Sequence, residues 1–310
     1  MYSVPALTLQ GEHIDLRAKQ LRFHELGIDK ASVRVQEYNG WKPKRNEPDD
    51  SASWGSPFNP DRFDVQIDRI HLTASSFHYT VDNPHSTPQW FDEKNILIQQ
   101  INADITDTHI KADTLFAQIK NLQARERCGL QLVSLQGTLK LNQREAIVQQ
   151  LDLHTAYSHL TDRYEMHYAT FHDFNDYIHK VRMKASLHHS NVSSMDIAYF
   201  APLLQNYPVA VDLSGQMEGT VDHLSGQQIH VSTLSTIVSG DARIDGLPDT
   251  DSATFHITHL LCSGSGSDLT RLIPQTKVPS LNWNTLSAFT YQGTYDGMVS
   301  RFQTSGHLSS

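Results

Sequence analysis

The chain has 310 residues, of which 38% are hydrophobic, and carries a formal net charge of −9. This acidic balance, without a basic cluster, disfavours a nucleic-acid-binding protein and electrostatic docking on anionic lipid headgroups. The apolar residues are regularly placed, which argues against disorder for most of the chain. No apolar run approaches the ~20 residues of a membrane-spanning helix, and we expect no signal peptide at Met1.

Alternation of apolar and polar residues is the strongest local signal, and it predicts strands along most of the chain. In chain order, residues 1–38 are expected to form an N-terminal β segment. Residues 39–63 are rich in Pro, Asp, Ser and Asn, which predicts a flexible loop. Residues 64–310 are expected to form a repetitive β-rich segment.

Each strand predicted after residue 64 has one apolar face and one polar face. Few helices are predicted, so the apolar faces must pack on one another or line a cavity. We therefore predict an all-β fold, an elongated repetitive trough of β-taco or solenoid type with a few short helices. A sandwich and a folded-over sheet stay open, as does the choice between an open groove and a filled interior. The residues expected to line a groove are Ile101, Ile105, Val133, Leu135, Leu139, Leu141, Val181, Met183, Leu187, Val209, Val211, Leu213, Ile229, Val231, Phe255 and Ile257.

One segment of the chain recurs. Asp196–Pro202 is matched 72 residues later (268 − 196) by Asp268–Pro274, with apolar residues at +1, +4 and +5 after the Asp and Pro at +6. An apolar strand follows each copy, and then the pair Gly215/Gly219 or Gly293/Gly297, which we interpret as turn or bulge glycines. The repeat covers about residues 180–230 and 252–303, and it indicates an array with a long surface.

Each Asp-to-Pro segment predicts one short helix. Ser193 or Ser194 is expected to cap the first helix and Ser267 the second, with the Asp in the first turn, where the helix dipole favours it. The Pro is expected to end the helix. The apolar side chains at +1, +4 and +5 share one face and are expected to plug the end of a sheet.

No sequence motif indicates catalysis. Gly264-Ser-Gly266 lacks the third glycine and the lysine of phosphate-binding loops. Neighbouring histidines such as His188 and His189 point to opposite faces of a strand, and no pair of carboxylates stands out. We therefore predict no enzyme activity, no catalytic residue, no metal and no cofactor. Cys128 and Cys262 are expected to be unpaired, since distant parts of an array rarely touch.

The order of several short motifs resembles the large TamB/AsmA-like envelope proteins, particularly those of Bacteroidetes-type bacteria. The resemblance covers about residues 65–310, and Cys128 departs from the small polar residue expected before Gly129. The stretches that carry it are Phe91–Asn102 (FDEKNILIQQIN), Ile119–Leu130 (IKNLQARERCGL), Asp196–Pro202 (DIAYFAP), Leu213–Val221 (LSGQMEGTV), Gly246–Asp249 (GLPD) and Asp268–Pro274 (DLTRLIP).

The resemblance implies a trough-shaped bridge that crosses the periplasm and moves phospholipid between the inner and outer membranes. It also implies support of outer-membrane protein assembly beside an outer-membrane barrel partner. This chain would be an internal, non-enzymatic segment, periplasmic and anchored in the inner membrane through an N-terminal segment that it does not include. Phospholipid acyl chains would occupy the groove, and nucleic acid is not an expected partner.

Two other classes of function stay open. One is an extracellular β-solenoid or sandwich enzyme acting on polysaccharide, which needs a polar cleft with converging carboxylates. The other is an adhesive or chaperoning β-repeat, whose exposed strand edge pairs with client strands. A continuous apolar groove favours the lipid bridge over both.

Overall fold

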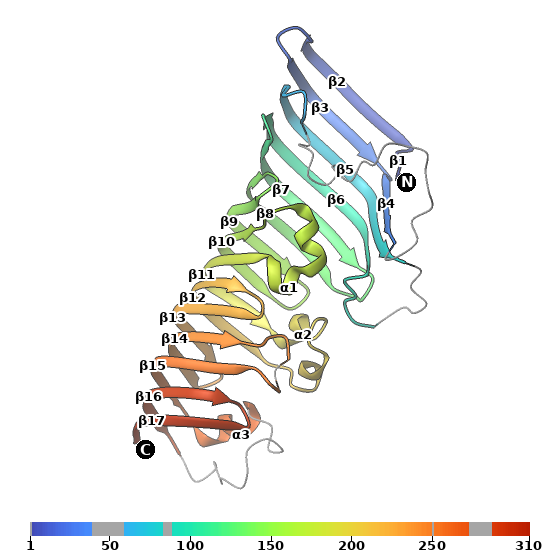
Figure 1. Ribbon diagram of the computed structural model, residues 1–310. Coiled ribbons are helices and arrows are strands. Elements are labelled where there is room, and N and C mark those ends of the chain that lie inside the picture. The colour runs from blue at the N-terminus through green and yellow to red at the C-terminus, as the bar shows by residue number, and fades with distance from the viewer. Residues whose placement is uncertain (1, 39–58, 83–88, 250, 273–286) are drawn as a thin grey trace. The chain divides into compact units, whose positions relative to one another are not determined.

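The computed structural model describes residues 2–38, 59–82, 89–249, 251–272 and 287–310 (Figure 1). The described residues form seventeen strands and a few short helices, so the predicted all-β class is confirmed. No described helix is long and apolar enough to cross a membrane. Most of the predicted loop 39–63 lies outside the described residues. Its end is a turn in which Asn59 Nδ2 donates to the Phe63 carbonyl over 2.7 Å.

The chain divides into two compact units. Unit 1 comprises residues 1–156 and 165–176, and unit 2 comprises residues 157–164 and 177–310. The strand β10 (His159–His167) contributes residues to both. Unit 1 contains β1 (Tyr2–Ser3), β2 (Ala6–Asp15), β3 (Gln20–Asp29), β4 (Ser32–Glu37), β5 (Asp64–Val81), β6 (Asn95–Lys111), β7 (Thr114–Glu126), β8 (Gln131–Leu141), β9 (Glu145–Thr155) and the 3₁₀-helix η1 (Phe171–Asp176).

The sheet of unit 1 is mixed. β3 and β4 both run parallel to β5 and pair with successive parts of it, because β5 is eighteen residues long. All other pairings are antiparallel, from β5 through β9 in chain order and between β2 and β3. The strands of residues 1–38 therefore belong to the same sheet as β5.

A short helix covers one end of the unit 1 sheet. In η1, Asn175 accepts a 3.0 Å hydrogen bond from the hydroxyl of Tyr79 and donates to Glu37 over 3.2 Å. Just before η1, Tyr168 packs its ring against Phe174, 4.9 Å away, and its hydroxyl donates to the Asn142 carbonyl. η1 thus connects the ends of β4 and β5 to the turn between β8 and β9. Burial and the Glu37 carboxylate raise the pKa of Tyr79, which keeps its phenol a neutral donor.

Unit 2 is antiparallel throughout, with each strand paired to the next in chain order. Its strands are β11 (Arg182–Ser193), β12 (Ala210–Thr220), β13 (His223–Thr233), β14 (Thr236–Asp245), β15 (Thr254–Gly264), β16 (Phe289–Met298) and β17 (Arg301–Ser309). The helices are α1 (Tyr177–Lys180), α2 (Ser194–Ile197), η2 (Pro202–Asn206) and α3 (Gly266–Leu272).

A line of bulges crosses unit 2 at one level. The register shifts once in each of the five pairings from β11 to β16, and His189, Gln228 and His259 have positive φ at that level of β11, β13 and β15. A bulge bends its strand and adds one residue, so the apolar positions change parity across it. On β13, for example, Leu224 and Ile229 point to the same side although they lie five positions apart in the sequence.

Glycine occupies the positions that face these bulges. A Cβ on Gly215 of β12 would lie 2.8 Å from Ile229 Cδ1 and 2.9 Å from the Gln228 carbonyl oxygen, and its φ is +136°. Gly240 of β14 has φ +156°, and a Cβ there would lie 2.8 Å from the Thr258 carbonyl oxygen. The interpretation of Gly215 as a bulge glycine is confirmed.

The two copies of the repeat share one contact between helix and turn. In the first, Asp196 of α2 accepts a 2.5 Å hydrogen bond from the Ser158 hydroxyl, in the turn before β10. In the second, Asp268 of α3 accepts from both the backbone N–H and the hydroxyl of Ser235, in the turn before β14. Each copy therefore consists of a turn, two strands, a helix and two further strands. The Asp of the helix is hydrogen-bonded to the Ser of the turn.

Several predicted details of these helices are corrected. Ser193 caps α2 as expected, but Ser267 lies inside α3, and Ser265 accepts the hydrogen bond from the Asp268 N–H. Pro202 begins η2 instead of ending α2, which stops at Ile197. Ile197 and Phe200 are 41% and 51% exposed and do not plug a sheet, because the helix is too short and turns its small residue Ala198 inward instead.

Candidate functional site

Rows of apolar residues cross the sheet of unit 1 on one face. Residues paired directly between neighbouring strands point to the same side. Leu115, Ala117 and Ile119 alternate on β7, and Ala103 and Ile105 alternate on β6, so the three rows that run through these residues share one side. The rows are Leu7, Ile28, Leu72, Ala103 and Leu122; Leu9, Leu26, Ile70, Ile105 and Ile119; and Ile14, Leu21, Val65, Ile110, Leu115 and Leu141. The apolar face of unit 1 is therefore continuous from β2 to β8.

Unit 2 has an equivalent apolar face. Leu213, Met217 and Gly219 alternate on β12, so the rows through them share one side of the sheet. These rows are Met183, Gly219, Leu224, Ile244, Phe255, Gly297 and Phe302; Ala185, Met217, Gly226, Ala242, Ile257 and Tyr295; and Ser190, Leu213, Val231, Val238, Cys262, Tyr291 and Leu308. The bulges keep the two ends of each strand on this common face.

Both faces are accessible rather than packed. Among the described residues of these faces, a few large apolar side chains are buried, such as Ile119 and Leu187 at 6% and 4% exposed, while most residues of the rows are partly exposed. Leu7 and Ile14 of β2 are 58% and 61% exposed, and Phe302 and Leu308 of β17 are 49% and 54% exposed. A filled core of this many apolar residues would leave most of them buried. The described apolar faces therefore have the character of an open surface.

Most of the predicted groove residues lie on these faces. In unit 1, Ile101, Ile105, Leu135, Leu139 and Leu141 share the apolar side, by alternation with row residues of β6 and β8. In unit 2 the same holds for Met183, Leu187, Val211, Leu213, Ile229, Val231, Phe255 and Ile257.

Three predicted groove residues lie elsewhere. Val133 is the extra residue of a bulge on β8 and is 40% exposed, so it does not take part in the rows. Val181 precedes β11 and is completely buried. Val209 precedes β12, where its N–H donates to Ser194 Oγ, and it lines a separate cleft. Alternation alone does not reveal the bulge or the strand ends that remove these residues.

The opposite face of each sheet carries pairs of histidine and aspartate on neighbouring strands. In unit 1 the pairs are His24/Asp68, His71/Asp104 and His109/Asp64, at 2.9, 2.6 and 2.8 Å. In unit 2 they are His188/Asp162, His223/Asp245, His256/Asp296 and His259/Asp241, at 2.7, 2.7, 2.6 and 3.0 Å. The sequence predicted these histidines to lie on strands, but their aspartate partners are identified only by the register.

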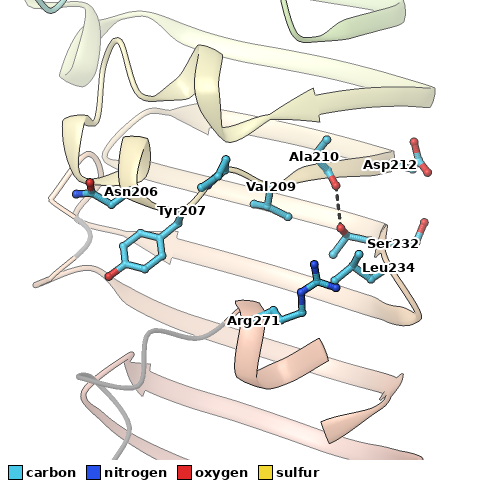
Figure 2. A pocket seen from close by; sticks show the side chains of 10 residues that line it. Asn206, Tyr207, Val209, Ala210, Asp212, Ser232, Leu234 and Arg271 are labelled. Carbon is cyan, nitrogen blue, oxygen red and sulfur yellow. Dashed lines mark hydrogen bonds between the residues drawn. The ribbon is translucent and has the colours of Figure 1, made fainter. Parts of the chain in front are cut away.

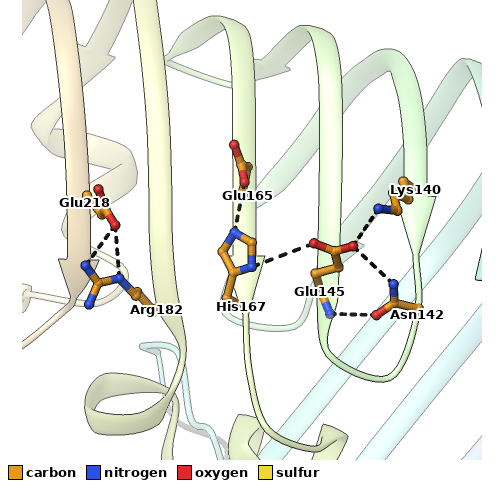
Figure 3. Close-up of polar contacts among 7 residues, drawn as sticks. All are labelled: Lys140, Asn142, Glu145, Glu165, His167, Arg182 and Glu218. Carbon is orange, nitrogen blue, oxygen red and sulfur yellow. Dashed lines mark hydrogen bonds and ion pairs between the residues drawn. The ribbon is translucent and has the colours of Figure 1, made fainter.

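In several of these pairs the pKa of one partner is shifted. The hydrogen bond to Asp68 raises the pKa of His24, and the hydrogen bond from His223 lowers the pKa of Asp245. Figure 3 shows two further ionic contacts, one in each unit. In unit 1, Glu145 contacts Lys140 over 2.7 Å, and this contact lowers its pKa. In unit 2, Arg182 contacts Glu218 over 2.8 Å. These charged groups are thus engaged in cross-strand contacts that hold neighbouring strands in register.

A cleft of about 510 Å³ lies in unit 2, between the two copies of the repeat (Figure 2). The segment from η2 into β12 forms one wall, with Tyr207 and Val209, and the turn between β13 and β14 contributes Leu234. Arg271 of α3 reaches into the cleft, and Asp212 of β12 also lines it. The Thr233 hydroxyl donates to the Ala210 carbonyl over 2.8 Å, and this hydrogen bond joins the end of β13 to the start of β12 at the cleft.

Both cysteines are free thiols, and burial raises the pKa of each, that of Cys128 to about 11. They are therefore protonated and weakly nucleophilic at neutral pH.

Comparison with models of protein families, with curated proteins and with solved structures gave no match. The two apolar faces and the cleft are therefore the features of the described residues that point to a function.

Proposed function

We propose that this chain is a non-enzymatic segment of a periplasmic bridge that moves phospholipid between the inner and outer membranes. In this role it also supports outer-membrane protein assembly beside a barrel partner. The observation that carries the proposal is the continuous row pairing of accessible apolar residues, from β2 to β8 in unit 1 and from β11 to β17 in unit 2. The resemblance to TamB/AsmA-like proteins agrees with it.

The acyl chains account for the main free-energy barrier to moving a phospholipid through water. Burying a methylene group is worth about 0.8 kcal/mol, so a lipid with two ordinary chains loses about 20 kcal/mol when both are exposed to water. An apolar surface that continues from strand to strand removes most of this barrier at every step. Movement along it needs no bond to be made or broken, and therefore no catalytic residue.

The distribution of charge on the two faces supports the same reading. Within the described strands, the apolar rows contain no Asp, Glu, Lys, Arg or His, while the histidine–aspartate pairs occupy the opposite face. A desolvated charge in the path of an acyl chain would cost several kcal/mol. The separation of charge from the rows is what sliding chains require.

Site-specific photo-cross-linking tests the proposal directly. A benzophenone amino acid would replace Leu213 on the apolar face of β12, or Gln216 on its exposed opposite face as the matched control. We expect phospholipid adducts at position 213 in cells and none at position 216. Equal labelling at both positions, or no lipid adduct at 213, would contradict a lipid-carrying face.

A further inference from the structure

The cleft between the two copies of the repeat has the features of a headgroup site. Its wall is apolar where Tyr207 and Leu234 line it, and these side chains are 40% and 60% exposed. Leu234 adopts φ +53° in the turn after β13, which turns an apolar side chain into the open cleft where a turn residue is usually polar. Such exposure without a protein partner suits an apolar ligand.

Arg271 supplies the positive charge of the cleft. Its guanidinium makes no hydrogen bond or ion pair with the described residues, whereas Arg182 and Arg243 of the same unit are both paired with carboxylates. The two acidic groups nearby already have partners. Asp268 accepts hydrogen bonds from Ser235, and Asp212 accepts one from Asn191 Nδ2 over 3.0 Å. Within the described residues, the N–H donors of Arg271 therefore have no hydrogen-bond partner and can meet an anion that enters the cleft, while its charge also helps to lower the pKa of Asp268.

The internal repeat shows that this arginine is not required by the fold. Aligned on Asp196 and Asp268, Arg271 corresponds to Tyr199 of the first copy. The contact from the helix Asp to the turn Ser is present in both copies. The arginine is thus an addition to a shared scaffold, and in the second copy it lines a cleft.

We propose that this cleft binds the phosphate headgroup of a phospholipid, with Arg271 holding the phosphate and Tyr207 and Leu234 contacting the glycerol and upper acyl carbons. Asp212, which also lines the cleft, would accept the ammonium of a zwitterionic headgroup, so phosphatidylethanolamine should bind more tightly than phosphatidylglycerol. The inference rests on the proposed function, because it gives the headgroup of the same lipid a place in unit 2.

The test measures binding of monomeric short-chain phosphatidylethanolamine, short-chain phosphatidylglycerol and inorganic phosphate to the whole chain by calorimetry. Arg271→Gln should weaken binding of both lipids about tenfold or more, since one charge-assisted contact is lost. Leu234→Asn, which tolerates the positive φ, should weaken both lipids while leaving the weak binding of inorganic phosphate unchanged. Asp212→Asn should remove the preference for phosphatidylethanolamine. Unchanged melting temperatures would show that the variants fold.

The outcomes separate the two proposals. Equal lipid affinity of Arg271→Gln and the unaltered chain would overturn the headgroup site. Cross-linking at position 213 would still test independently whether the apolar face carries lipid. Binding of inorganic phosphate as tight as that of lipid, and lost equally in Arg271→Gln, would mean a simple anion site and would also overturn the proposal. Absence of lipid binding in calorimetry together with absence of adducts at position 213 would reject both.

Discussion

The two copies of the repeat in unit 2 have the same supports and different surfaces. In both, a buried Asp in the first helical turn accepts a hydrogen bond from a Ser in the turn before the first strand of the copy. In both, a glycine in the strand after the helix, Gly215 or Gly293, faces the bulged neighbour strand. The outward position three residues after the Asp is Tyr199 in one and Arg271 in the other. The Asp–Ser contact and the glycine that the copies share position the strands. The side chain that differs, Tyr199 or Arg271, can serve ligand recognition.

The largest expected effect concerns the shared glycines. A Cβ on Gly293 would lie 2.2 Å from the Ser305 carbonyl oxygen, and one on Gly215 would lie 2.9 Å from the Gln228 carbonyl oxygen. We expect Gly215→Val and Gly293→Val each to reduce the free energy of unfolding by about 3 kcal/mol or more, because backbone atoms must move. Urea denaturation followed by circular dichroism measures this.

The matched control is Gly27→Ala on β3. A Cβ there would lie 3.6 Å from Thr8 Cβ, an ordinary contact, so the change should stay within about 0.5 kcal/mol. Destabilisation of similar size in the control and in the two variants would show that the bulge line does not depend on glycine.

The Ser–Asp contact should be stronger in the first copy than in the second. The Ser158 hydroxyl donates to Asp196 and also accepts from the Ser193 N–H, so Ser158→Ala removes one hydrogen bond from each of two groups. Ser235→Ala removes one of two hydrogen bonds to Asp268 and keeps the other. We expect losses in unfolding free energy of about 2 kcal/mol and about 1 kcal/mol respectively. The control is Ser225→Ala on the exposed face of β13, and the reverse ranking would refute the comparison.

The smallest expected effect is a dependence of stability on pH. The raised pKa of His24 means that its contribution is present below about pH 6.5 and is lost as pH rises through the folded value. The lowered pKa of Asp245 means that its contribution is present above about pH 3.8 and is lost as pH falls through the folded value. Stability should therefore be highest between these limits.

Urea midpoints measured across this range check the pH dependence. His24→Gln should flatten the profile on its alkaline side, because it removes the pair that raises the pKa of His24. His223→Gln should flatten the profile on its acid side, because it removes the hydrogen bond that lowers the pKa of Asp245. A profile that keeps rising above neutral pH would count against a stabilising role for protonated His24.

Sequence periodicity predicts the class of this fold well and its local irregularities poorly. Alternation identified the strands because a half-exposed sheet needs a period of two, and the recurring Asp and Gly positions indicated an array. Gly215 was interpreted as a turn or bulge glycine, but the bulged residues of the neighbouring strands, His189, Gln228 and His259, were not predicted, because their positive φ depends on pairing with the next strand. Val133 was misplaced for that reason. The histidine–aspartate pairs and the cleft at Arg271 depend on register and on the spacing of the copies, which a single sequence does not contain.

The most direct test of the apolar face compares two carboxylates on one strand. Leu213→Asp places a charge in a row of β12, and Gln216→Asp places the same charge on the opposite, exposed face. Each purified chain would be analysed for bound phospholipid by native mass spectrometry, with circular dichroism as the control for folding. If the face carries acyl chains, Leu213→Asp stays folded because water reaches the open surface, and it loses its lipid, while Gln216→Asp retains lipid. Unfolding of Leu213→Asp would indicate a filled interior, and normal lipid occupancy in a folded Leu213→Asp would contradict the lipid-carrying face.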